Sequence, residues 1–222
     1  MLTLPEELLL LALRDREGSV VSSASQALPF GLAGAVLLEL SLQDRIVLEG
    51  GKFIVRNTTP TGNDIFDEAL AKIRASKKTH KPSYWVSKLS GLRKLKDRLL
   101  DRLAMQGILR REAHKVLWVF PTQRYPTLSG GPEMKRRELI RSAILHRVEP
   151  DERTGILISL VSACNLVNEI FSKEERKAAQ KRVKEIAQGE AVGKAVSDAV
   201  AGVRAAVAAG IAASMIASTA RR

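Results

Sequence analysis

The sequence has few of the residues and motifs on which most enzymes and metal proteins depend. Among 222 residues there are one cysteine and three histidines, and no cluster of cysteines, histidines or carboxylates has metal-ligand spacing. A phosphate-binding glycine loop, a dinucleotide fingerprint and a Gly-x-Ser-x-Gly elbow are all missing. The single thiol, Cys164, lies in an apolar run, where a buried structural role is expected. We therefore predict a protein that is not an enzyme and that uses no metal or cofactor.

Aromatic residues are also scarce, at 4% of the chain against 45% for all hydrophobic residues. The core must therefore be built from Leu, Val, Ile and Ala, which favours helices. No basic secretory leader opens the chain. The longest uncharged tract near its end, 205–219, has 15 residues, fewer than the ~18–20 that a membrane span needs. Because a lone cysteine fits a reducing compartment, we expect a cytoplasmic protein whose contact with membranes is peripheral, on their cytosolic face.

Acidic residues are nearly missing from one segment, 72–116. It contains three acids and fourteen basic residues, so it carries +11 of the chain's net +12. The basic residues are Lys72, Arg74, Lys77, Lys78, Lys81, Lys88, Arg93, Lys94, Lys96, Arg98, Arg102, Arg110, Arg111 and Lys115. Such concentrated charge complements a polyanion. The candidates are a leaflet of acidic lipids and a nucleic-acid backbone.

Periodicity predicts a mainly α fold with two short β-hairpins. Helices are expected at 4–13, 28–42, 64–76, 84–89, 92–106, 133–145, 153–171, 172–188 and about 190–217, and hairpins at 45–56 and 108–120. The Pro/Gly/Thr/Ser-rich segment 121–134 is interpreted as a linker between a helix/hairpin half, 1–120, and a helical half, 135–222. We expect helix 153–171 and the Ala-rich last helix to pair at the centre of the bundle.

Five segments occur in an order that is specific when they are taken together. They are 2–18 (LTLPEELLLLALRDREG), 31–45 (GLAGAVLLELSLQDR), 60–70 (PTGNDIFDEAL), 85–91 (WVSKLSG) and 92–109 with its helix and hairpin start. Together they resemble the Golgi phosphoprotein 3 (GPP34) family, whose members are peripheral proteins that bind phosphatidylinositol 4-phosphate on Golgi membranes. The resemblance extends from Leu2 to about Phe171, and we expect a bacterial-type member. It implies one domain over 1–222, a helical bundle wrapped by amphipathic helices.

The resemblance also implies a lipid head-group site. Arg93 matches the first of two arginines that the family uses late in the chain, and Lys96 stands where the second would be. Arg98 matches a further family arginine, and Lys94 lies between them. We therefore predict that Arg93, Lys94, Lys96 and Arg98 bind anionic head groups. On the expected helix, Arg93 and Lys96 are three residues apart and share one flank.

Two members of the family's site have no counterpart here. Ala33 stands where the family has an early arginine, and the segment 18–29 contains no tryptophan. The remaining tryptophan of the resembling segments, Trp85, is expected to pack in the interior. Because selectivity needs fixed bidentate donors, we expect weak discrimination among acidic lipids and expect Ala33→Arg to strengthen it.

The second hairpin resembles one that mediates oligomer contacts in the family. Val116, Trp118 and Phe120 alternate with further apolar residues, so the strand is apolar on both faces and is expected to contribute to a homo-oligomer. Two other functions remain open. One is a winged-helix-like nucleic-acid binder, which the Lys- and Arg-rich helix 92–106 disfavours because such side chains contact phosphate without distinguishing bases. The other is a scaffold for an acidic partner, such as the cytoplasmic tail of a membrane protein.

Overall fold

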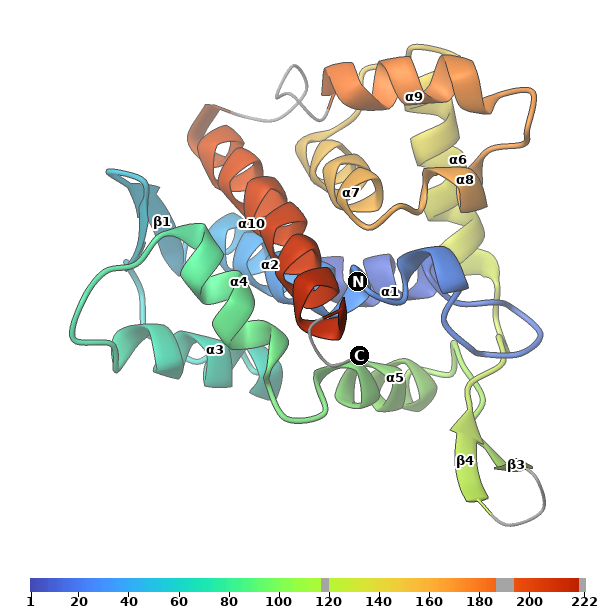
Figure 1. Cartoon of the computed structure of the whole chain (residues 1–222), viewed down its shortest axis with the longest axis horizontal. Helices are drawn as coiled ribbons and strands as arrows, with labels where there is room; N and C mark the ends of the chain where they lie inside the picture. The colour runs from blue at the N-terminus through green and yellow to red at the C-terminus, as the bar shows by residue number, and fades with distance from the viewer. Residues whose placement is uncertain (117–119, 187–193, 220–222) are drawn as a thin grey trace.

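The mainly α fold with short hairpins is confirmed by a computed structural model, which describes residues 1–116, 120–186 and 194–219 (Figure 1). In chain order the elements are α1 (Leu4–Leu11), the 3-10 turn η1 (Ser22–Ala24), α2 (Leu28–Leu42), β1 (Ile46–Glu49), β2 (Lys52–Val55), α3 (Asp64–Arg74), α4 (Pro82–Ser90), α5 (Leu95–Met105), β3 (Glu112–Val116), β4 (Phe120–Arg124), α6 (Gly131–Leu145), α7 (Glu152–Ala163), α8 (Val167–Ile170), α9 (Arg176–Glu185) and α10 (Lys194–Thr219).

Helix α2 lies at the centre of the molecule (Figure 1). It is apolar around most of its circumference, and it contacts α1, α3, α4, α5, α7 and α10. A helix without a polar face must be covered on all sides. The centre predicted from sequence, a pair formed by 153–171 and the last helix, is therefore corrected: α10 packs mainly on α2 and α4, with α7 as a lesser neighbour.

The helix expected at 153–171 is interrupted. α7 ends at Ala163, and Asn165 adopts a left-handed backbone with φ 59°. Asn is one of the few residues that enters this region at modest strain. The chain then forms the short helix α8 and the turn that leads to α9. This break lets Cys164, which is completely buried, and Leu166 both reach the core.

A second break separates α4 from α5, and it changes the candidate site. The helix predicted at 92–106 begins only at Leu95, because Lys94 has a left-handed backbone with φ 53°. Leu92 and Leu95, on either side of this turn, are both buried, so the break inserts two leucines into the core. Arg93 lies in the turn, and the prediction that Arg93 and Lys96 share a helix flank is wrong.

The first hairpin has the predicted form. β1 pairs antiparallel with β2 from Ile46–Val55 to Glu49–Lys52. Gly50 and Gly51 form the turn with φ 56° and 73°, as a two-residue primed turn requires.

The second hairpin is shifted from its predicted place. β3 pairs with β4, with Glu112 opposite Arg124 and Val116 opposite Phe120. Residues 121–124 thus belong to a strand and α6 begins at Gly131, which corrects the interpretation of 121–134 as a linker. Of the three apolar residues predicted to mediate assembly, Trp118 lies outside the described residues, and the side chains of the other two are not described.

The parts of the chain before and after the predicted linker share one hydrophobic core. α1 contacts α6 and α7, and an ion-pair network crosses the same boundary. Arg153 on α7 reaches Glu7 on α1 at 3.2 Å and Glu39 on α2 at 3.1 Å. Burial raises the pKa of Glu7 although its arginine neighbours oppose the shift.

The expectation that no stretch of the chain reaches the length of a membrane span is corrected by helix α10. Its segment Ser197–Ala217 has 21 residues and contains an 18-residue stretch with a mean hydropathy of 1.8, of which 28% is buried. Among the described residues it is the helix that is long and apolar enough to cross a membrane, judged by length and composition alone. A helix in a protein core can meet the same criterion, and the first part of α10 lies in the core, because Val200, Val203 and Val207 are buried.

Candidate functional site

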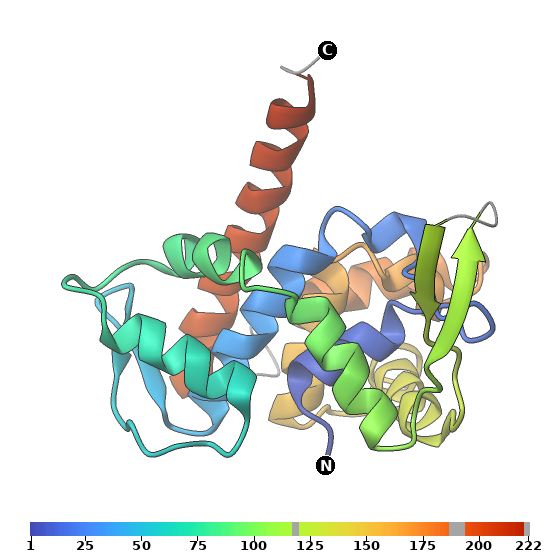
Figure 2. The ribbon, with the colours of Figure 1, turned by 90° about the horizontal axis from the view of Figure 1, so that it is seen from below.

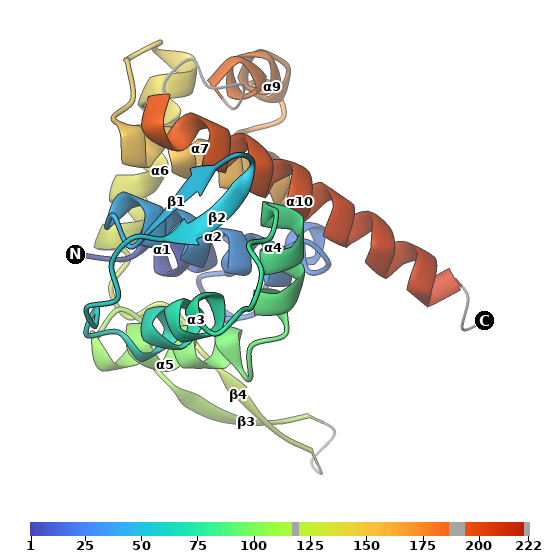
Figure 3. The same ribbon diagram turned by 90° about the vertical axis from the view of Figure 1, so that its left-hand side faces the viewer.

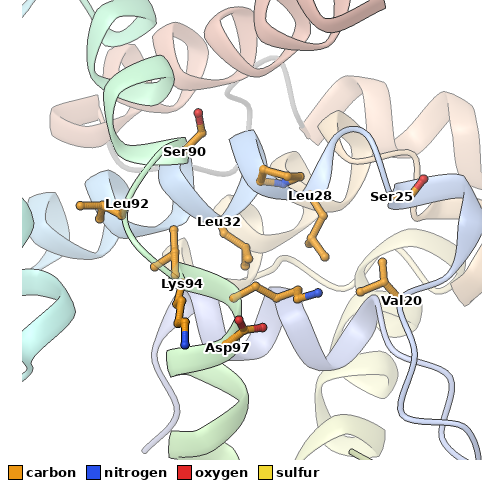
Figure 4. Close-up of a pocket in the computed structure, with 11 residues that line it drawn as sticks. Val20, Ser25, Leu28, Leu32, Ser90, Leu92, Lys94 and Asp97 are labelled. Carbon is orange, nitrogen blue, oxygen red and sulfur yellow. The ribbon is translucent and has the colours of Figure 1, made fainter. Parts of the chain in front are cut away.

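A pocket of about 400 Å³ lies where the segment before α2 meets the turn between α4 and α5 (Figure 4). Its wall is largely apolar, with Leu28 and Leu32 from α2 and Leu92 from the turn. Polar groups stand around the wall: Ser25, Ser90, Lys94, Lys96 and Asp97. A pocket with an apolar wall and few polar groups suits an amphipathic ligand.

A larger hollow of about 720 Å³ adjoins this pocket and shares Val20, Lys94, Lys96 and Asp97 with it. It extends towards the base of the second hairpin, where Arg111 and Arg124 contribute further charge. Together the two hollows are lined by four cations and by two acids, Asp97 and Asp101. The surface is therefore positive on balance, but modestly so.

Two helices begin at the pocket. Leu28 and Pro29 open α2, and Leu95 and Lys96 open α5. The first N–H groups of a helix have no intrahelical acceptor, and neither α2 nor α5 has a side-chain cap. Each such end carries about half a positive charge. Pro29 has no N–H and the Leu95 N–H donates to Leu92 O at 3.2 Å, so fewer donors than usual remain at these ends. Two positive helix ends at one pocket nevertheless favour an anion.

The two lysines at the pocket, Lys94 and Lys96, form no ion pair with the described part of the chain. Lys94 and Lys96 are exposed, as is Arg93, and within the described part of the chain no ion pair or side-chain hydrogen bond engages any of these three. Asp97 lies close enough in sequence to offset part of this charge. Lys94 and Lys96 lie on either side of Leu95 in the sequence. Because α5 begins only after Lys94, which has a left-handed backbone, both lysines lie at the start of the helix and not along its flank.

Arg98 has a different environment from the other three predicted head-group residues. Its Nη2 lies 2.6 Å from Asp64 Oδ2, and its Nη1 lies 2.6 Å from Glu68 Oε2. Burial alone would raise the pKa of Asp64, but hydrogen bonds from Arg98 hold it below its usual value. Arg98 does not line either hollow, and neither does Arg93. Its guanidinium joins α5 to α3.

A tight loop fixes the wall opposite the lysines. Gly18 has φ 58°, and a Cβ at this position would lie 2.1 Å from the backbone carbon of Tyr125, so only glycine fits. Leu13 pairs with Val20 in an isolated bridge, which directs the chain towards the pocket. The Tyr125 hydroxyl donates to Asp101 Oδ1 at 2.9 Å, and its pKa is raised to about 12, first by burial and then by that carboxylate. Tyr125 therefore stays neutral at physiological pH.

The two positions where the sequence departs from the family pattern have different structural settings. The segment 18–29 does form part of the pocket, through Val20, Ser25, Leu28 and Pro29. Ala33, by contrast, is completely buried in α2. An arginine there would have no route to the pocket without displacing core side chains.

Sequence reasoning found the lysines of the site and missed its apolar wall. The signal for the uncapped helix starts was present, because Ala27 and Lys94 occupy N-cap positions that usually hold Ser, Thr, Asp or Asn. Trp85 is 1% exposed and packs edge-on against His80 at 5.8 Å. It is an interior residue, as predicted.

Comparison with known proteins identifies the class. Residues 4–203 match the family described as Golgi phosphoprotein 3 (GPP34), and the chain belongs to that family. One curated relative is vacuolar protein sorting-associated protein 74 of Eremothecium gossypii, which is 30% identical over 161 residues. The match covers 62% of this chain and 48% of the relative, so the chain spans about half the length of that protein. Neither comparison tests the expected bacterial-type origin.

Proposed function

We propose that this protein binds the head groups of anionic phospholipids as a peripheral membrane protein, and that the pocket between α2 and α5 is its head-group site. The observation that carries the proposal is the meeting of two uncapped helix starts and two unpaired lysines at one amphipathic hollow. Helix ends supply N–H donors for phosphate oxygens, and lysines supply full charges. The apolar wall can contact the glycerol and upper acyl region.

The same residues imply modest head-group selectivity. Lys94 and Lys96 are flexible point charges, whereas selective phosphate recognition uses preorganised bidentate arginines. A phosphate monoester such as phosphatidylinositol 4-phosphate brings more negative charge than phosphatidylserine. At matched surface charge we expect the two to differ by less than about tenfold, which corresponds to about 1.4 kcal/mol.

Family membership and the relative's name, which refers to protein sorting to the vacuole, support a role in membrane traffic on the cytosolic face. Binding, and not catalysis, is the activity that we assign. Cytoplasmic tails of membrane proteins are a second class of partner, and a homo-oligomer is the expected assembly. Duplex nucleic acid is the alternative ligand for the basic surface, so the experiment must distinguish lipid binding from nucleic-acid binding.

Flotation with vesicles of phosphatidylcholine containing phosphatidylserine or phosphatidylinositol 4-phosphate tests the proposal. Lys94→Glu/Lys96→Glu should lower partitioning by at least about tenfold, since each basic residue near an acidic surface contributes about 1 kcal/mol. The matched control is Lys181→Glu/Lys184→Glu, the same charge change on exposed positions of α9, which lies across the body from α5 (Figure 1).

Equal loss in both variants would show that diffuse charge and not the pocket binds the membrane. No vesicle binding by the wild type would overturn the proposal. Competing duplex DNA at equal phosphate concentration should leave flotation nearly unchanged. Displacement from the vesicles would favour the nucleic-acid function.

A further inference from the structure

The end of α10 projects out of the molecular body (Figures 2 and 3). Up to Val207 the helix is a core element, with Val203 and Val207 fully buried. Gly210 packs closely on Phe30, since a Cβ there would lie 2.5 Å from the Phe30 ring, and Ile211 is partly buried against the core. Beyond it, Met215 is 53% exposed and Ile216 is 70% exposed.

This projecting end is apolar in composition, and exposing apolar side chains to water is unfavourable. The sequence has no charged residue from 205 to 219, and 212, 213, 215, 216 and 217 are all exposed. With about 100° between successive residues, Met215 and Ile216 are neighbours on one side of the helix. The small residues Ala213 and Ala217 lie on the other side. The exposed end therefore has one bulkier apolar face, formed by Met215 and Ile216.

The projecting end begins beside the candidate head-group site. Phe30, which packs on Gly210, follows Pro29, and Pro29 lines the pocket. Two perpendicular views show that α10 extends on the side of the body that carries η1 and the segment before α2 (Figures 2 and 3). A surface that presents head groups to Lys94 and Lys96 therefore also meets the end of α10.

We propose that residues 212–219 of α10 insert into the interfacial layer of the same acidic bilayer whose head groups the pocket binds. This inference rests on the proposed function and adds an apolar anchor to it. Eight residues of helix are about 12 Å long. At a shallow angle in a head-group layer about 5–7 Å thick, such a helix brings its apolar face to the acyl chains.

A shallow angle follows from the next part of the sequence. Arg221 and Arg222 come directly after this helix in the chain. Arginine is excluded from hydrocarbon but attracted to head-group phosphates. With Met215 and Ile216 towards the acyl chains, a helix at a shallow angle leaves the segment after it at the depth of the phosphates, to which guanidinium groups are attracted. Charge from the pocket and apolar contact from the helix then act as two signals, which stable anchoring generally needs.

An environment-sensitive fluorophore on Met215→Cys tests the insertion directly. Cys164 is fully buried and its pKa is raised to about 12 by burial, so the introduced thiol is the reactive one. Vesicles of phosphatidylcholine and phosphatidylserine should shift the emission to the blue, and brominated acyl chains should quench it. Neither change should occur with pure phosphatidylcholine vesicles.

A pair of matched variants measures the contribution to binding. Met215→Ser/Ile216→Ser should weaken partitioning into acidic vesicles by about tenfold, since partial burial of two large apolar side chains is lost. Ala213→Ser/Ala217→Ser places the same two hydroxyls on the other side of the helix and should change partitioning less than about twofold. Circular dichroism checks that both variants keep the helix content of the wild type.

Each outcome separates this inference from the function on which it rests. Vesicle binding with a probe that remains in water would overturn the insertion and leave the head-group site standing. A blue shift that needs no vesicles and grows with protein concentration would show that a second copy of the chain covers the helix, which also overturns it. Failure of the wild type to bind vesicles would remove the proposed function and the insertion together.

Discussion

Arg98 Nη2 lies 2.6 Å from Asp64 Oδ2, and this ion pair gives one basic residue of the charged segment 72–116 a structural role. The same guanidinium also reaches Glu68 on α3 at 2.6 Å. Arg102, one turn further along α5, forms ion pairs with Glu6 at 3.4 Å and with Asp64 at 3.5 Å. Part of the charge that the sequence concentrates between 72 and 116 is thus neutralised within the molecule, while Lys94 and Lys96 are left for a ligand.

Replacing Arg98 by alanine should therefore affect stability more than lipid binding. The free energy of unfolding should fall by about 1 kcal/mol, because a bidentate but partly exposed pair is lost. Partitioning into acidic vesicles should change less than about twofold. Lys96→Ala, the comparison variant, should do the reverse. Urea titration and flotation measure the two effects, and a large binding defect in folded Arg98→Ala would place this arginine back among the head-group residues.

The contrast between Arg98 and its neighbours shows where sequence reasoning succeeds. The strong periodicity of α3 and the strongly apolar composition of α2 predicted both helices well, because such patterns leave few alternatives to burial. The start of α5 was predicted three residues too early, since neither glycine nor asparagine marks the left-handed residue, Lys94. Charge density alone did not distinguish paired from unpaired arginines. That distinction depends on α3 lying beside α5.

The candidate pocket required the tertiary fold for the same reason. Its walls come from the segment before α2 and from the turn before α5, which are far apart in the chain. The shift of the second hairpin has a local cause. Pro121 suggested a linker, but β3 and β4 form a sheet of two strands, so each is an edge strand and has a side free for a residue without an N–H.

Stability should decrease between about pH 4.5 and pH 7 because of Glu133. Burial raises the pKa of this carboxyl from 4.5 to about 7, despite the opposing hydrogen bond from Arg137. Between these values the folded state binds more protons than the unfolded state, so the free energy of unfolding falls as pH rises. The total effect is on the order of 2–3 kcal/mol. Glu133→Gln should flatten the profile in urea titrations at several pH values, and an unchanged slope would contradict the assignment.

Shortening the second hairpin should reduce the assembly to a smaller species. Replacing residues 113–123 by Asn-Gly would join Glu112 and Arg124, which are opposite each other in the sheet, through a favoured two-residue turn. Tyr125 and its contact with Gly18 would remain. Light scattering should report a lower mass if the hairpin mediates self-association. The same mass for a variant with native circular dichroism would assign assembly to another surface.

Selectivity for a phosphate monoester should be gained at Ser25 and not at Ala33. Ala33 is completely buried, so Ala33→Arg places an unpaired charge in the core and should destabilise the protein by about 3 kcal/mol or more. Ser25 is exposed and lines the pocket, so Ser25→Arg adds a guanidinium that can hold a phosphate bidentately together with Lys94 and Lys96.

The expected result is a preference for phosphatidylinositol 4-phosphate over phosphatidylserine that rises from less than tenfold to more than tenfold at matched surface charge, measured by vesicle binding. Gln180→Arg, on an exposed position of α9, is the control for added charge. If both arginine variants raise the affinity for both lipids equally, the pocket does not contact the phosphate. If the wild type already prefers the monoester well beyond tenfold, the two lysines and the helix starts form a more selective site than their flexibility implies.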